Sequence, residues 1–219
     1  MRTKPLEDIK IAPKLDRITH EPIGGYWKVI DFPRSQEWDE DDWETAIDIF
    51  EDRIYGRFIN LVREIENLPN SGFSVMALDC LLVETLQQFR EGKGKTPKNK
   101  GAEYFGKFLT QTKFQSGFGK TYGDDTLAHR FYVQIRCGIL HQAETMTDSR
   151  IIYSQSTKEI VKPTEKGILV NRYAFHEMLI KVFDDFVQRL RNSLLPDDSN
   201  LREPFKKKMK YICRLEFEE

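Results

Sequence analysis

The chain is poor in cysteine, and its three cysteines are far apart in the sequence. No Cys-x-x-Cys pair occurs among Cys80, Cys137 and Cys213, and the number of cysteines is odd. A disulfide framework and a structural zinc site both need paired or clustered cysteines, so the sequence argues against both classes. Separated free cysteines are typical of a reducing compartment, and we therefore expect a cytoplasmic protein.

Long apolar runs are missing as well. No stretch approaches the roughly 18 consecutive apolar residues that a membrane-spanning helix needs. The stretch from Met1 to Lys14 is too charged for a signal peptide. An excess of one charge is also absent, because 34 Lys and Arg residues stand against 35 Asp and Glu residues. We expect no membrane contact, and any contact with nucleic acid must use a local patch.

Apolar side chains at helical spacing are what the chain has in quantity. Of its 219 residues 39% are hydrophobic and 32% are charged, which is typical of a folded globular protein. The fold class that we predict is mainly α: an up-and-down bundle of four to five helices, with a small β-hairpin insertion and an extended N-terminal arm. The arm is expected over 1–38, the bundle over 39–195 with the β insertion at about 150–170, and a C-terminal helix with an acidic tail over 196–219.

Proline, glycine and capping residues mark the expected ends of these elements. Helices are predicted over about 39–68, 73–90, 100–114, 124–144 and 171–194, with a shorter one over 203–215. The expected N-caps are Asn171 and either Asp124 or Asp125, and Pro196 is expected to close the fifth helix. One short strand is expected over 26–30, and segments 150–153, 159–162 and 167–170 predict a small hairpin or sheet.

The fourth predicted helix carries the main chemical signal. Arg136-Cys137-Gly138 leads into His141-Gln142, which places a guanidinium and an imidazole five positions apart late in an amphipathic helix. This Arg-x4-His spacing within a helical chain resembles the motif of the HEPN superfamily, whose active members are metal-independent ribonucleases. The resemblance covers about 39–195 and leaves out the arm, the β insertion and the C-terminal tail.

The resemblance implies an endoribonuclease with Arg136 and His141 as its catalytic pair. Cleavage of RNA without a metal needs a base for the 2′-hydroxyl proton and a fixed cation for the charge that builds up on phosphorus. An imidazole and a guanidinium suit these two tasks, because the imidazole changes charge near neutral pH and the guanidinium is always charged. The family also implies a homodimer with a composite cleft, a role as a toxin or anti-phage defence effector, and a cognate protein inhibitor.

Helix geometry restricts how the pair can meet. Five residues of an ideal α-helix correspond to about 140° of rotation and roughly 7.5 Å of rise, so the two side chains would not share a face. They converge if Gly138 permits a π-type widening or an early end of the helix. Alternatively, a two-fold dimer brings Arg136 of each chain to His141 of the other.

Further residues are candidates for the cleft or for substrate binding. Near the pair these are Glu84, which is a potential partner of Arg136 or of a lysine, and His129, Tyr132, Cys137, Gln142, Glu144 and Glu103. RNA phosphates are expected to contact a basic loop of Arg90, Lys93, Lys95, Lys98 and Lys100, or the lysines of 206–210. No His and carboxylate grouping has the spacing of a metal site, so we predict no metal and no cofactor.

The alternative is a non-catalytic helical dimerisation or protein-interaction module. In that interpretation Arg136 forms an ordinary ion pair with an acidic residue and His141 borders the helix end. Many catalytic HEPN members have a polar residue, often Asn, directly after the arginine, whereas this chain has Cys137. Separation of the two groups, their burial by packing, or a carboxylate partner for each would favour the module.

Overall fold

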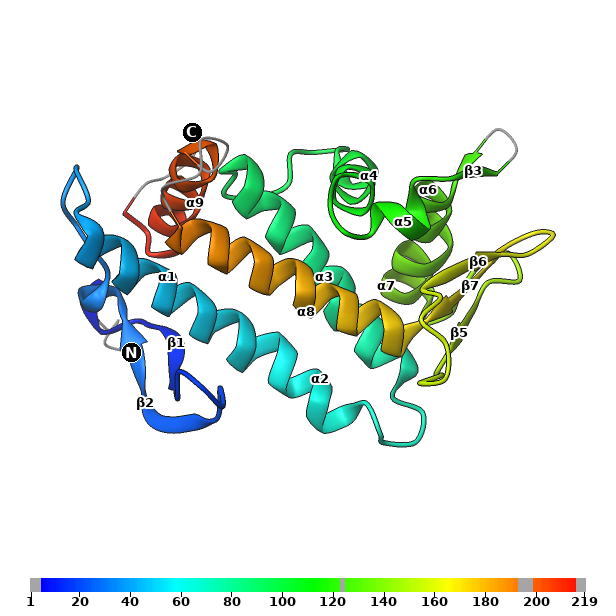
Figure 1. Ribbon diagram of the computed structural model, residues 1–219, viewed down its shortest axis with the longest axis horizontal. Coiled ribbons are helices and arrows are strands. Elements are labelled where there is room, and N and C mark those ends of the chain that lie inside the picture. The colour runs from blue at the N-terminus through cyan, green and yellow to red at the C-terminus, as the bar shows by residue number, and fades with distance from the viewer. Residues whose placement is uncertain (1–4, 123–124, 193–198, 216–219) are drawn as a thin grey trace. The chain divides into compact units, whose positions relative to one another are not determined.

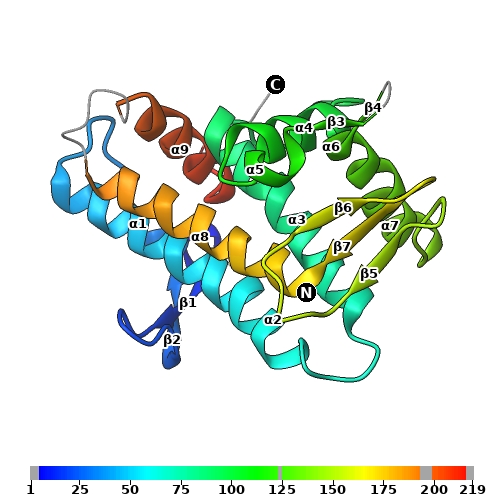
Figure 2. The same ribbon diagram turned by 45° about the vertical axis from the view of Figure 1, so that its right-hand side comes forward.

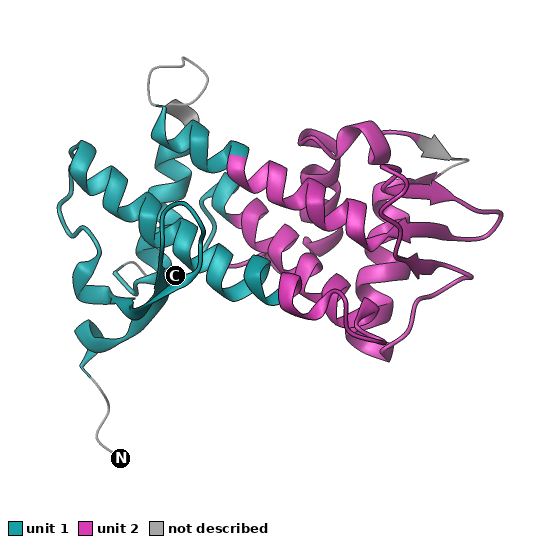
Figure 3. Ribbon diagram, turned by 60° about the horizontal axis from the view of Figure 1, so that its bottom comes forward, with its two compact units in different colours: residues 1–61, 89–94, 185–219 teal, residues 62–88, 95–184 magenta. Residues whose placement is uncertain are grey.

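The computed structural model describes residues 5–122, 125–192 and 199–215. The protein is mainly helical with small sheets, as predicted (Figure 1). Its contacts divide it into two compact units, shown in Figure 3. Unit 1 consists of residues 1–61, 89–94 and 185–219, and unit 2 of residues 62–88 and 95–184. Unit 1 thus combines the predicted arm and C-terminal segment with the first part of the predicted bundle.

The N-terminal arm of unit 1 folds as a β-hairpin. Strand β1 (Lys10–Leu15) pairs antiparallel with β2 (Pro22–Lys28). The strand expected over 26–30 is confirmed in part, since β2 covers residues 26–28, but β1 was not expected. Pro13 lies inside β1, and proline usually disfavours a strand interior. Here the register shifts between Pro13 and Leu15, and such an irregularity accommodates the proline. Residues 29 and 30 belong instead to a 3₁₀ turn, Val29–Asp31.

The hairpin is fastened to the first helix by one buried carboxylate. Asp52, on α1 (Glu40–Ile54), accepts hydrogen bonds from the backbone N–H of Leu15 at 3.2 Å and from Nε1 of Trp27 at 2.7 Å. It also pairs with Arg17. A buried carboxylate with three donors satisfies its own hydrogen-bonding needs and those of the hairpin backbone.

The first predicted helix is continuous but changes its winding. Asp39 caps α1 by accepting a hydrogen bond from the N–H of Asp42 at 2.9 Å. A π-helical segment, Tyr55–Ile59, follows, and then α2 (Asn60–Ile65). The helix ends a little before the predicted boundary at 68.

Aromatic side chains form the core of unit 1. The ring of Phe50 lies 4.3 Å from that of Phe89 and 5.3 Å from that of Phe205, measured between centroids. Phe205 belongs to α9 (Ser199–Ile212), which begins four residues before the predicted start at 203. Pro196 and the acidic residues 216–219 lie outside the described residues.

Unit 2 contains most of α3 (Gly72–Glu91) and α8 (Arg172–Arg191), together with α4 (Gly101–Gln111) and α5 (Gln115–Phe118). Aromatic rings are prominent in its core: Phe131 stacks on Phe175 at 5.0 Å, and Phe114 and Phe118 pack beside them. No element was predicted between the helices that were expected to end at 114 and to begin at 124. This was partly wrong, because α5 and the strand β3 (Thr121–Tyr122) lie there.

The predicted β insertion is a three-stranded sheet, visible beside α7 in Figure 2. Strand β7 (Ile168–Asn171) lies between β5 (Arg150–Ile152), to which it is parallel, and β6 (Val161–Pro163), to which it is antiparallel. Asn171 does not cap α8 as predicted. Its side chain bonds the backbone N–H and C=O of Ser154 instead, at 3.1 and 2.8 Å. Within the described residues, no helix has the length and apolar character needed to cross a bilayer.

Candidate active site

The helix of the Arg-x4-His motif consists of three parts. They are α6 (Leu127–Arg130), a π-helical segment Phe131–Cys137 and α7 (Gly138–Gln142). Its N-cap is Thr126, whose hydroxyl accepts a hydrogen bond from the N–H of His129 at 3.1 Å. Asp125 was expected there but lies in the short strand β4 (Asp125–Thr126), and Asp124 lies outside the described residues.

The π segment ends at Cys137, too early to bring the side chains of Arg136 and His141 onto one face of the helix. Arg136 lies inside it, whereas every step from Gly138 to His141 is α-helical. At about 100° per residue, the α-helical steps turn His141 away from the face of Arg136. Gly138 serves close packing, because a side chain there would collide with the carbonyl oxygen of Glu144. The π-type widening that was considered for Gly138 thus lies in the segment that ends at Cys137. Convergence of Arg136 and His141 within one chain is therefore disfavoured.

Arg136 is held in a defined position. Its Nη2 donates a hydrogen bond to Oε2 of Glu84 on α3 at 3.1 Å, and the two side chains are 18% and 19% exposed. The guanidinium also lies 5.4 Å from the ring centre of Tyr132 and 5.9 Å from that of Phe105. Burial alone would lower the pKa of Arg136, but the charge and the hydrogen bond of Glu84 outweigh burial and raise it. The arginine is thus charged and its orientation is fixed.

Glu84 is itself anchored. Its Oε1 accepts a hydrogen bond from the hydroxyl of Thr96 at 2.7 Å, and Thr96 accepts one from Nε2 of Gln88 at 2.9 Å. One carboxylate oxygen therefore holds Arg136 and the other is held by Thr96. This arrangement is the first of the two roles considered for Glu84.

His141 lies on the surface at the end of α7, before the left-handed residue Ala143, whose φ is 55°. Within the described residues its imidazole has no hydrogen bond and no ion pair. Gln142 and Glu144 are exposed beside it in the sequence. Two observations thus favour the module: the helix geometry separates the two groups within one chain, and Arg136 has a carboxylate partner. His141, in contrast, is exposed and has no carboxylate partner among the described residues.

The other predicted cleft residues are not gathered around the pair. His129 precedes Arg136 by seven positions, which would place it on nearly the same face of an ideal helix, but the π segment between them changes the helical phase. His129 is exposed and its Nδ1 lies 2.9 Å from Oδ1 of Asp125. Glu103 is exposed and pairs with Lys100 and Lys107.

The predicted basic loop is divided between the two units. Arg90 and Lys93 belong to unit 1, and Lys95, Lys98 and Lys100 belong to unit 2. The four lysines are exposed, whereas Arg90 is half-buried and burial lowers its pKa.

The C-terminal lysines are partly engaged within unit 1. Lys206 donates to the carbonyl oxygen of Gln36 at 2.6 Å, and Lys208 donates to that of Gly94. These contacts leave Lys206 and Lys208 less able to contact phosphate.

His176 has a partner in unit 2 that the sequence alone does not indicate. Nδ1 of His176 lies 2.8 Å from Oδ1 of Asp79, and the side chains are 3% and 1% exposed. Burial raises the pKa of Asp79, although the hydrogen bond of His176 opposes this shift. The sequence signal for this buried pair was a single aspartate in the apolar part of α3. Its histidine partner could not be identified from the sequence because it is 97 positions away.

The neighbouring thiols differ in accessibility. Cys80, which follows Asp79, is 1% exposed, and burial raises the pKa of its thiol well above the ordinary value. In unit 1, burial raises the pKa of Cys213 to about 12. Cys137, next to Arg136, is half-buried. A thiol must ionise to act as a nucleophile, so Cys80 and Cys213 are unreactive.

Among the described residues, no group of three or more His, Cys, Asp or Glu side chains is arranged to hold a metal ion. Comparisons of the chain with protein-family models, curated proteins and solved structures find no match. The functional assignment therefore depends on the geometry of the site.

Proposed function

We propose that the protein is a metal-independent endoribonuclease of HEPN type, with Arg136 and His141 as its catalytic pair. One observation carries the proposal. A guanidinium fixed by Glu84 and two aromatic rings lies on the same helix as an exposed imidazole that has no polar partner among the described residues. A preoriented cation and an available base are the two groups that this chemistry needs.

The reaction follows from these two groups. His141 accepts the proton of a ribose 2′-hydroxyl while the 2′-oxygen bonds to the adjacent phosphorus. Arg136 stabilises the negative charge on the phosphoryl oxygens in the transition state. The bond from phosphorus to the 5′-oxygen then breaks, and the protonated His141 donates its proton to that oxygen. The products are a 2′,3′-cyclic phosphate and a 5′-hydroxyl.

A two-fold dimer supplies the geometry that one chain lacks. The α-helical steps after Cys137 turn the imidazole away from the guanidinium. In a symmetric pair, each Arg136 faces His141 of the partner subunit, which gives two equivalent sites. The bundle of four to five helices, a HEPN-type domain over about 39–195 and the cytoplasmic location belong to the same proposal, as does the role of toxin or defence effector with a protein inhibitor.

The test is RNA cleavage in the presence of a chelator. We expect Arg136→Ala to slow cleavage about 100- to 1,000-fold and His141→Ala to slow it at least 100-fold. Arg136→Lys is the matched control, because it keeps the charge opposite Glu84 but loses the planar fork. It should unfold like the wild type and still cleave slowly. Equal cleavage by all four proteins, or none by the wild type, would refute the proposal.

Mixing the two inactive variants tests the composite site. A mixed dimer of Arg136→Ala and His141→Ala chains contains one complete site and one without either group. Random assortment should therefore restore about a quarter of wild-type activity. Failure to restore activity, with dimers present, would place both groups of a site in one chain.

The second candidate is the non-catalytic interaction module, and the ion pair of Arg136 with Glu84 favours it. A guanidinium whose charge is already balanced binds a phosphate less strongly, and the hydrogen bonds of Thr96 and Gln88 complete a structural network. If this candidate is correct, Arg136→Lys and His141→Ala leave dimerisation unchanged and no variant cleaves RNA.

A further inference from the structure

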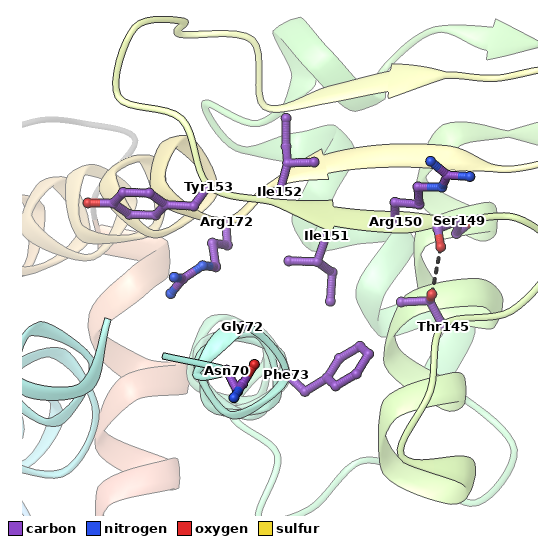
Figure 4. Close-up of a pocket in the computed structure, with 10 residues that line it drawn as sticks. All are labelled: Asn70, Gly72, Phe73, Thr145, Ser149, Arg150, Ile151, Ile152, Tyr153 and Arg172. Carbon is purple, nitrogen blue, oxygen red and sulfur yellow. Dashed lines mark hydrogen bonds between the residues drawn. The ribbon is translucent and has the colours of Figure 1, made fainter. Parts of the chain in front are cut away.

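A pocket of about 550 Å³ lies next to the helix of the Arg-x4-His motif (Figure 4). It is bounded by strand β5, by the first turn of α3 and by Arg172 at the start of α8. Its volume is within the range of sites that bind small organic molecules. All of its lining residues belong to unit 2.

The pocket has two cations and no acidic residue in its lining. Its ten lining residues include Arg150 and Arg172 but no Asp or Glu. Arg172 is half-buried, donates to the hydroxyl of Ser71 at 3.2 Å and lies 4.7 Å from the ring centre of Tyr153. Within the described residues, neither arginine has a carboxylate in ion-pair contact. Such a lining favours an anionic ligand.

The walls between the arginines are apolar and partly aromatic. Phe73 is 42% exposed and Tyr153 is 39% exposed, although both are large rings. Figure 4 shows Phe73 and Ile151 between Arg172 on one side and Arg150 on the other. Exposed rings beside cations are the combination that binds single-stranded nucleic acid, because bases stack on rings and phosphates pair with arginines.

The pocket is joined to the motif helix by the chain that follows His141. Ser149, in its wall, donates through Oγ to Oε1 of Gln134 at 2.7 Å. The N–H of Met146 donates to the carbonyl oxygen of Gln134 at 2.8 Å. Gln134 precedes Arg136 by two positions in the π segment. A ligand in the pocket is therefore next to the segment that carries the catalytic pair.

We propose that this pocket binds one nucleotide of the RNA strand, with its base against Phe73 and Tyr153 and its phosphates at Arg172 and Arg150. The assignment rests on the proposed function, since it names a substrate subsite of that ribonuclease. The same chemistry would also accept a free nucleoside monophosphate, so the experiment includes both ligands.

The experiment measures binding by the cleavage-deficient His141→Ala chain. Fluorescence anisotropy with a labelled single-stranded RNA of about ten nucleotides is recorded over a range of salt concentrations. We expect Arg172→Gln to weaken binding and to reduce the slope of log affinity against log salt by about 0.7, the value for one phosphate contact on a single strand. Phe73→Ala should weaken binding about tenfold without changing that slope.

Each substitution has a control on the same element or sheet. Lys162→Gln removes a cation from β6, the opposite edge strand, and Leu81→Ala removes an exposed apolar side chain from α3. Both should leave the affinity within about twofold. Arg150→Gln is a second binding variant that is not expected to disturb folding, because the exposed Arg150 side chain makes no hydrogen bond or ion pair among the described residues. This variant should also reduce the slope of log affinity against log salt.

Several outcomes would overturn the proposal. One is RNA affinity unchanged by Arg172→Gln, Arg150→Gln and Phe73→Ala, and another is an equal loss with Lys162→Gln. Adenosine monophosphate binding that requires Arg172, without RNA binding, would also overturn it by assigning the pocket to a free nucleotide. The two proposals fail separately. Cleavage by the wild type with unaffected pocket variants refutes the pocket alone, and pocket-dependent RNA binding without cleavage refutes the nuclease alone.

Discussion

Arg191 in unit 1 and Arg172 in unit 2 are both half-buried, yet their surroundings are opposite. Arg191 pairs with three carboxylates, those of Glu44, Asp48 and Glu51. Arg172 donates to a hydroxyl and stacks on a ring, and no carboxylate of the described residues pairs with it. An arginine surrounded by carboxylates holds a fold together, whereas one without them retains its capacity to bind an anion.

Arg136 is intermediate between these two cases, with a single carboxylate partner in Glu84. The comparison indicates that the charge of Arg191 is balanced by its neighbours, whereas that of Arg172 is not paired among the described residues. We therefore expect substitutions in the unit 1 network to change stability, and substitutions of the unit 2 cations to change binding and activity.

The largest expected effect is at Asp52. Asp52→Ala removes the acceptor of the Leu15 N–H and of the Trp27 indole, and it leaves both donors in a buried site. We expect a loss of about 3 kcal/mol in the free energy of unfolding, measured by urea denaturation. Asp48→Ala is the control, because Asp48 is more exposed. Equal losses in the two variants would show that the anchor of the hairpin is not Asp52.

Asp52 also predicts a pH dependence. Burial raises its pKa, although Trp27, Arg17 and Leu15 oppose the shift. The folded protein therefore holds this proton at pH values where the unfolded chain has lost it, and stability falls as pH rises from the ordinary carboxyl range through the raised value. Asp52→Asn should remove this decrease. A decrease of the same size in the variant would assign it to another group.

A smaller effect is expected at Arg191. Arg191→Ala leaves three carboxylates close together, and we expect unfolding to become easier by about 1 kcal/mol at low salt. Because salt screens the repulsion among these carboxylates, the loss should shrink at about 1 M salt. A loss that is independent of salt would mean that the arginine acts through packing.

The smallest effect on stability is expected at Arg172. Arg172→Leu breaks no ion pair among the described residues and preserves much of the apolar contact with Tyr153. We expect its free energy of unfolding to stay within about 0.5 kcal/mol of the wild type. A loss as large as that of Arg191→Ala would remove the contrast between the two units.

The sequence predicted the helices well, since their apolar stripes are local signals, although the expected N-caps Asn171 and Asp125 do not cap them. It also located the β insertion and named Glu84 as a potential partner of Arg136. Strand β1 escaped prediction because Pro13 gave a misleading local signal, and the π segments did so because periodicity does not reveal a local change in winding.

Long-range pairs were the least accessible to prediction. Asp79 and His176 are 97 positions apart and were not paired from the sequence. Glu84 was named only as a potential partner of Arg136 or of a lysine, 52 positions from that arginine. An apolar stripe shows which face of a helix is buried but not which helix it meets. The pocket was missed for the same reason, because Phe73, Ile151 and Arg172 come from three separate elements.

The unequal accessibility of the thiols allows a dye to be attached selectively to the helix of the Arg-x4-His motif. Cys80 and Cys213 are buried and their thiols resist ionisation, so a maleimide dye should react first at Cys137. A single dye next to Arg136 would report on the helix of the Arg-x4-His motif without any substitution. Its emission should change when RNA or a second subunit covers that helix, and mass spectrometry would verify one label per chain.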